Sequence, residues 1–537
     1  MRRNPARLAL DRYDIVVVGG GIYGACAAWD ASLRGLKVAL IDAGDFGGAT
    51  SSNSLRTLHG GLRHLQRGDF PSMRESIRAR RDWLRLAPHL TQPMRFVLPT
   101  SGRGLRGPAA LRLALAVNDL VGLDRNRGVA DTHRLPAGHV WSQRLARAVL
   151  SGTRVTGCNG AASWYDGICT NTERLLISVV DAAARSGARV ANYVRATGLL
   201  RRRTAVAGVT ARDELTGQEF EIRAEAVINA AGPWVGDWLG ALAPPQPLFV
   251  PSKAFNLVTR PLPFREGVGL PVRPGETYFV IPWNGRALVG TRHSRCPPET
   301  RSASVTQEDV QSFLNDLNRV LGRYRLANSD VIGVFSGLLP EKAGNTRADV
   351  ELERAARIVE HGAPGLVSVV GVKWTTARSV AEEAVRRVCR YLGRGNLRRA
   401  RASLGTVPIE LLDPDLPLSS ERVVAAVREE MAVQLEDVVM RRTPLYLSDQ
   451  LDGGLLESCA GIMARELRWT QRDIAEQIER TRTRLRGFRI SEERNGIRSS
   501  STGGSRGGAV AAADVPQVAQ EATEGRIADA PGGAHRR

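Results

Sequence analysis

The chain has 537 residues, 43% of them hydrophobic, and a formal net charge of +20. This length and apolar content predict a globular protein of two or three domains with a sizeable core. The positive charge is compatible with nucleic-acid binding, but the arginines are spread among acidic residues and accompany no nucleic-acid-binding motif, so we expect no nucleic-acid partner. Attraction to anionic lipid or to an anionic substrate explains the charge with fewer assumptions.

The cysteines and the N-terminus indicate the cellular setting. Six cysteines are scattered without the spacing of a disulfide framework or a zinc site, so we expect no metal and a reducing, cytoplasmic location. Asp11, Arg12 and Asp14 interrupt the apolar stretch that a signal peptide or membrane anchor needs. No window approaches the ~18 uninterrupted apolar residues of a spanning helix. We expect a soluble protein, with a peripheral position on the inner face of the cytoplasmic membrane as the alternative.

A strand, a glycine turn, a helix and a second strand are predicted at the start of the chain. "YDIVVV" at 13–18 predicts the first strand and "KVALID" at 37–42 the second. Between them, Gly19 permits a tight turn, Gly21 lets the backbone approach a pyrophosphate, and Gly24 allows close packing of helix on strand. Asp42 is placed to accept hydrogen bonds from a ribose. This unit predicts dinucleotide binding but does not separate FAD from NAD.

Four later segments add information and are taken here in chain order. Residues 49–66, "ATSSNSLRTLHGGLRHLQ", form a polar stretch too long for the ordinary loop of a nicotinamide domain. Residues 105–123 place Leu and Ala at helical spacing, which predicts either an interfacial membrane helix or a helix packed in the protein. "NAAGPWV" at 229–235 and "GVKWTTAR" at 371–378 follow.

The pattern of predicted secondary structure changes towards the C-terminus. Strand-like runs alternate with helices, such as 172–186, up to about residue 390, which predicts an α/β core. From 400 to 487 the pattern is helical, and Thr470 with Asp473 fits a capping box. Residues 488–537 contain almost no large apolar residues and are predicted to be a disordered tail.

Lysine is rare in this chain. Only four of the 75 Lys and Arg residues are lysines, namely Lys37, Lys253, Lys342 and Lys373. An ammonium is a compact point charge whose pKa can be tuned, so a site that needs one does not simply accept arginine. Lys373, within "GVKWTTAR", is therefore a candidate for a chemical role, although chance retention is the alternative.

In their order and spacing, the segments at 12–42, 49–66, 229–235 and 371–378 resemble the FAD-dependent glycerol-3-phosphate dehydrogenases, within the D-amino-acid-oxidase-like flavoprotein superfamily. The resemblance extends from about residue 12 to about 485. It implies an α/β fold with an FAD-binding Rossmann-like domain interleaved with a β-rich substrate domain over 12–390, plus a C-terminal helical domain over 400–487. The flavin parts would be about 12–100, 150–240 and 330–390, and the substrate parts about 100–150 and 240–330.

The resemblance also implies a reaction and a cofactor site. FAD would be held non-covalently, glycerol 3-phosphate would be oxidised to dihydroxyacetone phosphate, and a quinone or oxygen would accept the electrons. Residues carried over for the cofactor, beside Gly19, Gly21, Gly24 and Asp42, are Thr50, Ser51, Ser52, Gly60, Gly61, Gly371 and Thr375. Those carried over for catalysis are His59, Arg63 and Lys373, where Arg63 would meet the anionic substrate and His59 would either transfer a proton or only orient the glycine turn.

The chain departs from the family where substrate is handled. The family's "SGVRP" is here "SGLLP" at 336–340, so Leu339 replaces an arginine. Asn256, after Lys253, stands where the family has a histidine, and the family's "GTTD" becomes residues 290–293, "GTRH". Arg292 or Lys342 could bind the phosphate instead. The candidate substrate residues are therefore Lys253, Asn256, Arg292, Leu339 and Lys342. The alternatives are therefore an FAD oxidoreductase of another hydroxy or amino compound, or a catalytically silent flavoprotein that acts as a membrane-associated partner.

Overall fold

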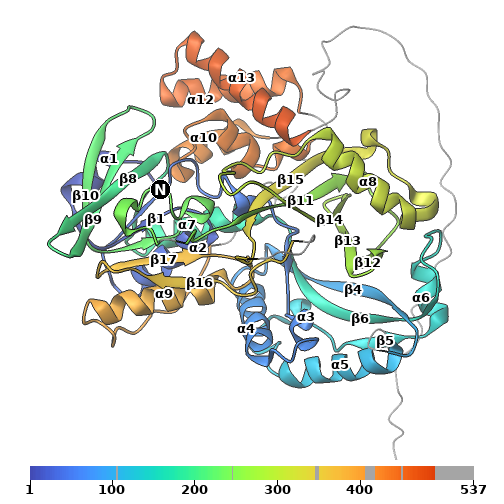
Figure 1. Ribbon diagram of the computed structural model, residues 1–537. Helices are drawn as coiled ribbons and strands as arrows, with labels where there is room; N and C mark the ends of the chain where they lie inside the picture. Colours follow the sequence, from blue (N-terminus) through green and yellow to red (C-terminus); the bar gives the residue numbers. More distant parts are fainter. Residues whose placement is uncertain (105–106, 245, 345–349, 406–417, 449–450, 490–537) are drawn as a thin grey trace, which may run out of the picture. The chain divides into compact units, whose positions relative to one another are not determined.

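The computed structural model describes residues 1–104, 107–244, 246–344, 350–405, 418–448 and 451–489. This part of the chain contains two β-sheets, helices that pack against them, and a group of C-terminal helices (Figure 1). Beyond its first two residues, the predicted disordered tail lies outside the described residues.

The first sheet is built around parallel strands. Its order is β16–β17–β10–β1–β2–β7, in which neighbours from β17 to β7 run parallel and β16 is antiparallel to β17. The antiparallel pair β8–β9 extends it beside β10. The strands are β1 (Arg12–Val18), β2 (Val38–Ile41), β7 (Arg189–Ala191), β8 (Val194–Arg202), β9 (Ala205–Asp213), β10 (Glu219–Asn229), β16 (Arg357–Glu360) and β17 (Leu366–Val370).

Helices cover the parallel sheet and bury its strands. α2 (Ile22–Leu33) contacts α7 (Thr172–Arg185) and α9 (Ala377–Tyr391) and shares one apolar core with them. The other face of the sheet packs against Leu8 and the β8–β9 pair in a second apolar core, so the apolar run in β1 is buried without alternation, as is typical of parallel strands. The predicted strand–turn–helix–strand unit and the helix at 172–186 are thereby confirmed.

The second sheet is mainly antiparallel, with order β15–β11–β14–β13–β12–β4–β6–β3 and β5 paired with β6. The strands are β3 (Thr57–Leu58), β4 (Thr91–Ser101), β5 (His139–Trp141), β6 (Cys158–Cys169), β11 (Pro251–Thr259), β12 (Gly267–Arg273), β13 (Glu276–Trp283), β14 (Arg286–Arg295) and β15 (Val331–Pro340). The second sheet extends beyond the segments predicted for the substrate domain, about 100–150 and 240–330. The strands β4, β6 and β15 also belong to this sheet.

Further helices surround the second sheet. α8 (Gln307–Leu321) packs on one face, where Phe313 meets Phe255 with ring centroids 5.5 Å apart. The helix predicted at 105–123 is α5 (Pro108–Val121), and residues 105–106 lie outside the described part. The other helices up to this point are α1 (Pro5–Leu10), α3 (Leu62–Leu65), α4 (Phe70–Leu86) and α6 (Gln143–Val149).

The predicted C-terminal helical region contains α10 (Ser420–Glu430), α11 (Leu435–Asp437), α12 (Gly453–Leu467) and α13 (Gln471–Phe488). Thr470 and Asp473 form the expected capping box at the start of α13. A shared apolar core joins these helices to the second sheet, and in it Phe335 of β15 contacts the rings of Tyr446 and Phe488. Among the described residues, no helix has both the length and the apolarity to cross a bilayer.

Candidate active site

A cavity of about 930 Å³ extends from the glycine turn after β1 to β11, β14 and β15. Its wall includes, among the predicted residues, Gly19, Gly21, Asp42, Thr50, Ser51, His59, Asn256, Leu339, Gly371, Lys373 and Thr375. Of the predicted residues that the structure describes, Gly24, Ser52, Gly60, Gly61, Arg63, Lys253, Arg292 and Lys342 are not on this wall. The volume and the position of this cavity suit a dinucleotide bound at the carboxyl ends of parallel strands.

The glycine turn between β1 and α2 has a tight backbone geometry that leaves no room for side chains. Gly19 has a φ of +101°, and a Cβ there would lie 2.5 Å from the carbonyl oxygen of Ala230. A Cβ on Gly24 would lie 1.8 Å from the carbonyl oxygen of Gly19, so the helix can follow the strand this tightly only with glycine. Side chains at these positions would push the turn apart.

Asp42 closes the second strand and faces the cavity. Its carboxylate accepts hydrogen bonds from the backbone amides of Gly20 at 2.6 Å and Gly44 at 2.8 Å. Burial raises the pKa of Asp42 to about 6, while these two amides favour the ionised form. The carboxylate is thereby fixed at the position where the fingerprint predicts an acceptor for ribose hydroxyls.

The segment around Thr50 folds over the start of α2. Ser51 accepts a hydrogen bond from the amide of Ile22 through its hydroxyl, at 3.0 Å, and through its carbonyl from Trp374 Nε1, at 3.1 Å. Thr50 Oγ1 donates to the carbonyl of Leu338, whereas Ser52 Oγ donates to that of Gly47 and so faces its own loop. Thr50 and Ser51 are therefore placed near the first phosphate-binding turn, and Ser52 supports the loop.

His59 lies on the cavity wall with 56% of its side chain exposed. Its amide donates to Thr375 Oγ1 at 3.1 Å, and its Nδ1 lies 3.7 Å from Asp166 Oδ2. Asp166 also accepts from the Gly60 amide at 2.7 Å and pairs with buried Arg80. Although burial raises the pKa of Asp166, Arg80 and His59 together lower it below its usual range. An ionised carboxylate therefore holds one side of the imidazole, and Gly60 and Gly61 form the turn behind it.

Lys373 sits in a turn that Tyr23 holds. The Tyr23 hydroxyl donates to the Lys373 carbonyl at 2.7 Å and accepts from the amides of Val372 and Lys373, both at 3.1 Å. The Lys373 Nζ lies 2.6 Å from His64 Nε2, and His64 Nδ1 lies 3.4 Å from Asp69 Oδ2. Burial is the main reason why the pKa of Lys373 is lowered, and Arg63 lowers it further against the acidic Glu75 and Asp69.

Arg63 is exposed at the same end of the site and forms no hydrogen bond or ion pair with the described residues. Its charge nevertheless acts on two neighbours. Burial lowers the pKa of His293 to about 4, and Arg63 contributes to this shift as it does for Lys373. His293 Nδ1 is buried without a partner among the described residues. The cations Arg63 and Lys373 therefore lie near a neutral imidazole, His293, whose Nδ1 has unused hydrogen-bonding capacity.

Strand alternation decides which substrate candidates reach the cavity. Ala254 and Asn256 of β11 line it, together with Thr291 of β14, whose hydroxyl donates to Asn256 Oδ1 at 2.7 Å. Leu339 is also on the wall and pairs across the sheet with Ser252, on the same face as Asn256. The cavity is thus apolar at Leu339 and amide-lined at Asn256.

Three of the candidate substrate residues, Lys253, Arg292 and Lys342, point away from the cavity. Lys253 faces α8 and contacts Asp309 Oδ2 at 2.5 Å. Arg292 donates to Asp316 at 2.8 Å and to Ser312 at 2.9 Å, again in α8. Lys342 lies 3.7 Å from Glu351, with 52% of its side chain exposed. The suggestion that Arg292 or Lys342 replaces the family's arginine is therefore not supported by their positions.

Several residues of the site escaped the sequence analysis. Tyr23, His64, Asp166 and Trp374 act through contacts between segments far apart in the chain, for which one sequence holds no signal. Residues of the C-terminal helices also line the cavity, namely Gln434, Glu436, Arg441, Arg480 and Arg484. The four-residue spacing of Arg480 and Arg484 predicts a common helix face, but nothing in the sequence assigns that face to the cavity.

Comparison with known proteins identifies the class that this fold and cavity define. The family model "FAD dependent oxidoreductase" matches residues 14–387, and "C-terminal domain of alpha-glycerophosphate oxidase" matches residues 379–474. The chain belongs to the FAD-dependent oxidoreductase family, so the predicted cofactor, fold class and enzyme class are confirmed. The glycine turn, Asp42 and the size of the cavity fit this cofactor.

Individual relatives are similar over different lengths. Glycerol-3-phosphate dehydrogenase of Synechocystis is 28% identical over 89% of this chain and 97% of the relative. Glycerol-3-phosphate dehydrogenase 2 of Mycobacterium tuberculosis is 32% identical, and the mouse mitochondrial glycerol-3-phosphate dehydrogenase 31%. The chain spans only 63% and 52% of the lengths of these two.

Solved structures show the same fold. Glycerol-3-phosphate dehydrogenase from Bacillus halodurans, complexed with FAD, superposes with a TM-score of 0.68 at 21% identity, covering 90% of this chain and 96% of that one. The L-alpha-glycerophosphate oxidase of Mycoplasma pneumoniae, with FAD bound, gives 0.53 at 17% identity, covering 76% and 100%.

Proposed function

We propose that the protein oxidises the secondary hydroxyl of glycerol 3-phosphate to the ketone of dihydroxyacetone phosphate. The observation that carries this proposal is the pair of cations Lys373, on the wall of the cofactor cavity, and Arg63, which lies close enough to lower the pKa of Lys373. A substrate that carries both a phosphate and an oxidisable hydroxyl matches such a pair, because charge-assisted hydrogen bonds to phosphate are among the strongest in proteins. The glycerol-3-phosphate dehydrogenases among the relatives support the same choice.

Bound FAD supplies a ring that accepts a hydride from the substrate carbon. The residues of this chain then have three tasks. Lys373 donates a hydrogen bond to the substrate oxygen as its bond to carbon becomes double, and His64 holds the ammonium in place. His59 accepts the hydroxyl proton on Nε2, which has no partner among the described residues, while Asp166 orients the ring. Arg63 binds the phosphate.

A substrate comparison tests the proposal. The Arg63→Gln variant should raise KM for glycerol 3-phosphate about tenfold or more, since one charge-assisted contact is lost, and should leave the KM for glycerol unchanged. Arg67→Gln, which alters another exposed arginine four residues away, is the matched control. An equal effect of Arg63→Gln on both substrates would contradict phosphate binding. Reduction of the cofactor by an amine or a hydroxy acid, but not by glycerol 3-phosphate, would favour the alternative substrates.

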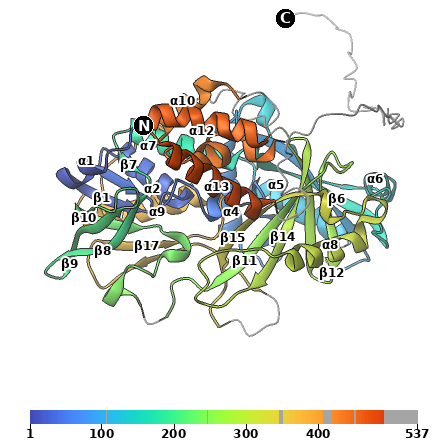
Figure 2. The ribbon, with the colours of Figure 1, turned by 90° about the horizontal axis from the view of Figure 1, so that it is seen from above.

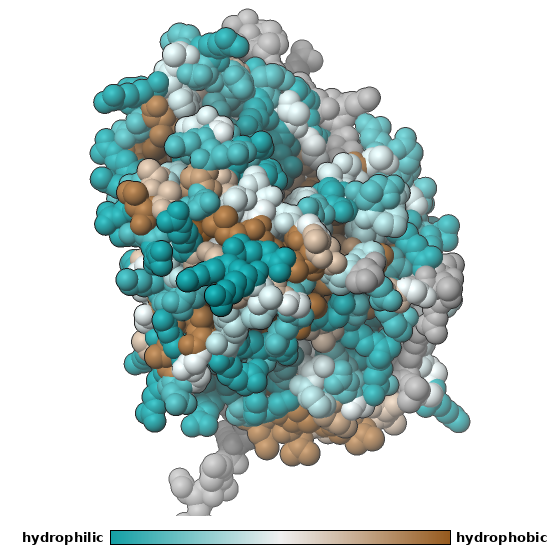
Figure 3. Space-filling model, turned by 60° about the vertical axis from the view of Figure 1, so that its left-hand side comes forward, coloured by the Kyte–Doolittle hydropathy of each residue, from teal (hydrophilic) through white to brown (hydrophobic). Residues whose placement is uncertain are grey.

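We also propose that α5 binds a membrane surface, where a quinone is one possible electron acceptor and oxygen the alternative. The exposed apolar residues of this helix and its C-terminal continuation lie on one stripe, Ala109, Leu113, Ala116, Leu120 and Leu123. Leu113, Leu120 and Leu123 are 67%, 66% and 78% exposed. A hydrophobic patch stands out at the lower edge of Figure 3, at the height where α5 lies in Figure 1. Arg112 is exposed beside the stripe, as is typical of interfacial helices.

Flotation with phosphatidylglycerol vesicles tests this surface. The wild-type protein should float at low salt, and a variant with Leu113→Glu and Leu120→Glu should stay at the bottom. Leu10→Glu, at an 83% exposed leucine of α1, is the control and should float. If the wild-type protein does not float, the membrane proposal fails and the substrate proposal is untouched.

A further inference from the structure

Three arginines from the C-terminal helical region line the cofactor cavity. Arg441 follows α11, and Arg480 and Arg484 lie one turn apart on α13. The cavity residues closest to them in the fold are those that follow β2, because Arg484 donates to the carbonyl of Gly48 at 3.3 Å and Arg441 to Asp45 at 2.5 Å. Seen from above, α13 runs across the junction of the two sheets (Figure 2). These arginines are therefore at the Asp42 end of the cavity.

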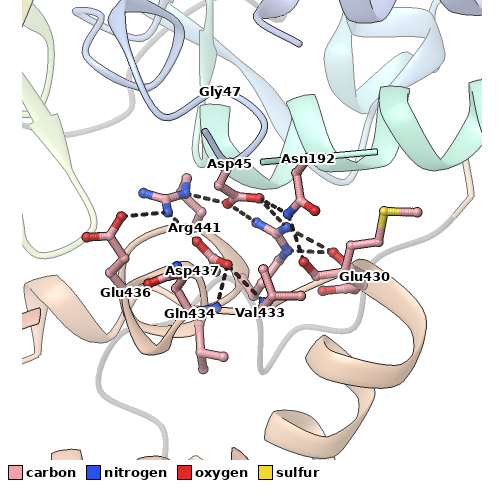
Figure 4. Close-up of polar contacts among 12 residues, drawn as sticks. Asp45, Gly47, Asn192, Glu430, Val433, Gln434, Glu436, Asp437 and Arg441 are labelled. Atoms are coloured by element: carbon pink, nitrogen blue, oxygen red, sulfur yellow. Dashed lines mark hydrogen bonds and ion pairs between the residues drawn. The ribbon is translucent and has the colours of Figure 1, made fainter. Parts of the chain in front are cut away.

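Arg441 is neutralised by the protein itself. Besides Asp45, its guanidinium contacts Asp437 at 2.6 Å and Glu436 at 3.5 Å (Figure 4). Asp45 also binds Arg442 at 2.6 Å, and all these acidic and basic groups lie between the loop after β2 and the C-terminal helices. This network attaches the helical region to the loop and leaves no charge on Arg441 for a ligand.

Arg484 differs from Arg441 because no acidic residue of the described chain pairs with it. Its hydrogen bond is to a backbone carbonyl, and Arg480, one turn away, has only a distant pair with Glu436 at 3.9 Å. The surrounding protein atoms and then the charge of Arg441 lower the pKa of Arg484, and the Glu436 carboxylate, on the same cavity wall, opposes this shift. Among the described residues, Arg484 is thus a cation on the cavity wall that forms no direct ion pair.

We infer that Arg484, assisted by Arg480, binds the diphosphate of FAD, so that the C-terminal helical region forms part of the cofactor site. The loop from Gly47 to Ser51 joins the Gly48 carbonyl, which Arg484 contacts, to Ser51, which bonds to the first turn of α2. A diphosphate at the N-terminus of α2 with its ribose at Asp42 lies along this loop. Arg484 contacts this loop at Gly48 and supplies the positive charge that the glycine turn lacks.

Binding measurements on the full-length protein test this inference without any substrate. After removal of the cofactor, the affinities for FAD, ADP and riboflavin are measured for the wild-type protein and for Arg484→Gln. We expect FAD and ADP to bind about tenfold to a hundredfold more weakly to the variant, because a charge-assisted contact to phosphate is lost, while riboflavin binding stays unchanged. The salt dependence of FAD binding should also become shallower.

Two further variants make the comparison specific. Arg486→Gln changes an arginine of the same helix that pairs with Glu479 at 2.6 Å, and it should bind FAD like the wild type. Arg484→Lys keeps a positive charge and should lie between the wild type and Arg484→Gln. Unchanged FAD affinity in Arg484→Gln, or an equal loss for riboflavin and ADP, would overturn the inference. Neither result would bear on the oxidation of glycerol 3-phosphate.

Discussion

The Lys373 ammonium donates to His64 Nε2 at 2.6 Å, across 309 positions of the chain. Because an ammonium can only donate, this contact assigns the imidazole proton to Nδ1, which faces Asp69 at 3.4 Å. Burial and then the charge of Lys373 lower the pKa of His64, which favours the neutral ring that this bond requires. His64 is therefore a positioning residue for the lysine.

Lys373→Met should leave FAD bound and slow flavin reduction by substrate. The change removes the charge but keeps most of the side-chain volume. If the lysine stabilises the transition state by about 2–3 kcal/mol, its replacement should lower the rate of flavin reduction on the order of a hundredfold. Stopped-flow absorbance under anaerobic conditions measures the rate, and the flavin content of the purified variant serves as the control. An unchanged rate would mean that the lysine is retained by chance.

His64→Gln should change the pH profile more than the rate at about pH 8, where the imidazole is neutral. In the wild type, reduction should slow as His64 becomes protonated below its ordinary pKa of 6.5, because the ring then loses its acceptor and repels Lys373. Glutamine can still accept from the lysine but does not titrate, so this acidic decline should shrink. The control is His139→Gln, at an exposed histidine. A variant profile that parallels that of the wild type would argue against the positioning role.

The general fold and the cofactor class were predictable because they depend on local patterns. The glycine spacing, the buried strand and the acid at its end lie within one short segment, so Gly19, Gly24 and Asp42 were recognised from the sequence. The interaction of Lys373 with His64 was not, since it depends on two turns that meet only in the folded chain. The candidate substrate residues Arg292 and Lys253 do not reach the cavity, because a shift of one position along a strand exchanges its two faces. Both residues lie on the face opposite Asn256.

Leu339→Arg should lower KM for glycerol 3-phosphate. The leucine is on the cavity wall, and neither Arg292 nor Lys342 lies there, so an added guanidinium meets no competing cation from them. The gain should appear mainly in KM, because the contact is present in both the bound substrate and the transition state. Steady-state kinetics with glycerol 3-phosphate and glycerol measure it. A higher KM for the phosphate would show that this end of the pocket does not face it.

Arg292→Ala should leave KM for glycerol 3-phosphate unchanged and lower the melting temperature. The guanidinium contacts Asp316 and Ser312 of α8, and its loss leaves the buried Asp316 with fewer partners. Kinetics and thermal unfolding on the same preparation separate the two effects. A collapse of substrate affinity would instead return Arg292 to the phosphate site.

His293 should make the protein less stable in acid. Its folded-state pKa is about 4 against an ordinary 6.5, so between these pH values the unfolded chain binds a proton that the folded one does not. The free energy of unfolding therefore falls as the pH drops through this window. His293→Gln removes this contribution, so the difference in melting temperature between variant and wild type should shift in the variant's favour from pH 6.5 towards pH 4. A difference independent of pH would show that His293 titrates normally.

Anaerobic titration of the purified flavoprotein with glycerol 3-phosphate tests the central claim most directly. The account predicts that the visible absorbance of the oxidised flavin disappears and that dihydroxyacetone phosphate forms in an amount equal to the flavin reduced. Lys373→Met, measured in parallel, should reach the same end point slowly. A flavin that stays oxidised with glycerol 3-phosphate but is bleached by dithionite would contradict the assignment of the substrate.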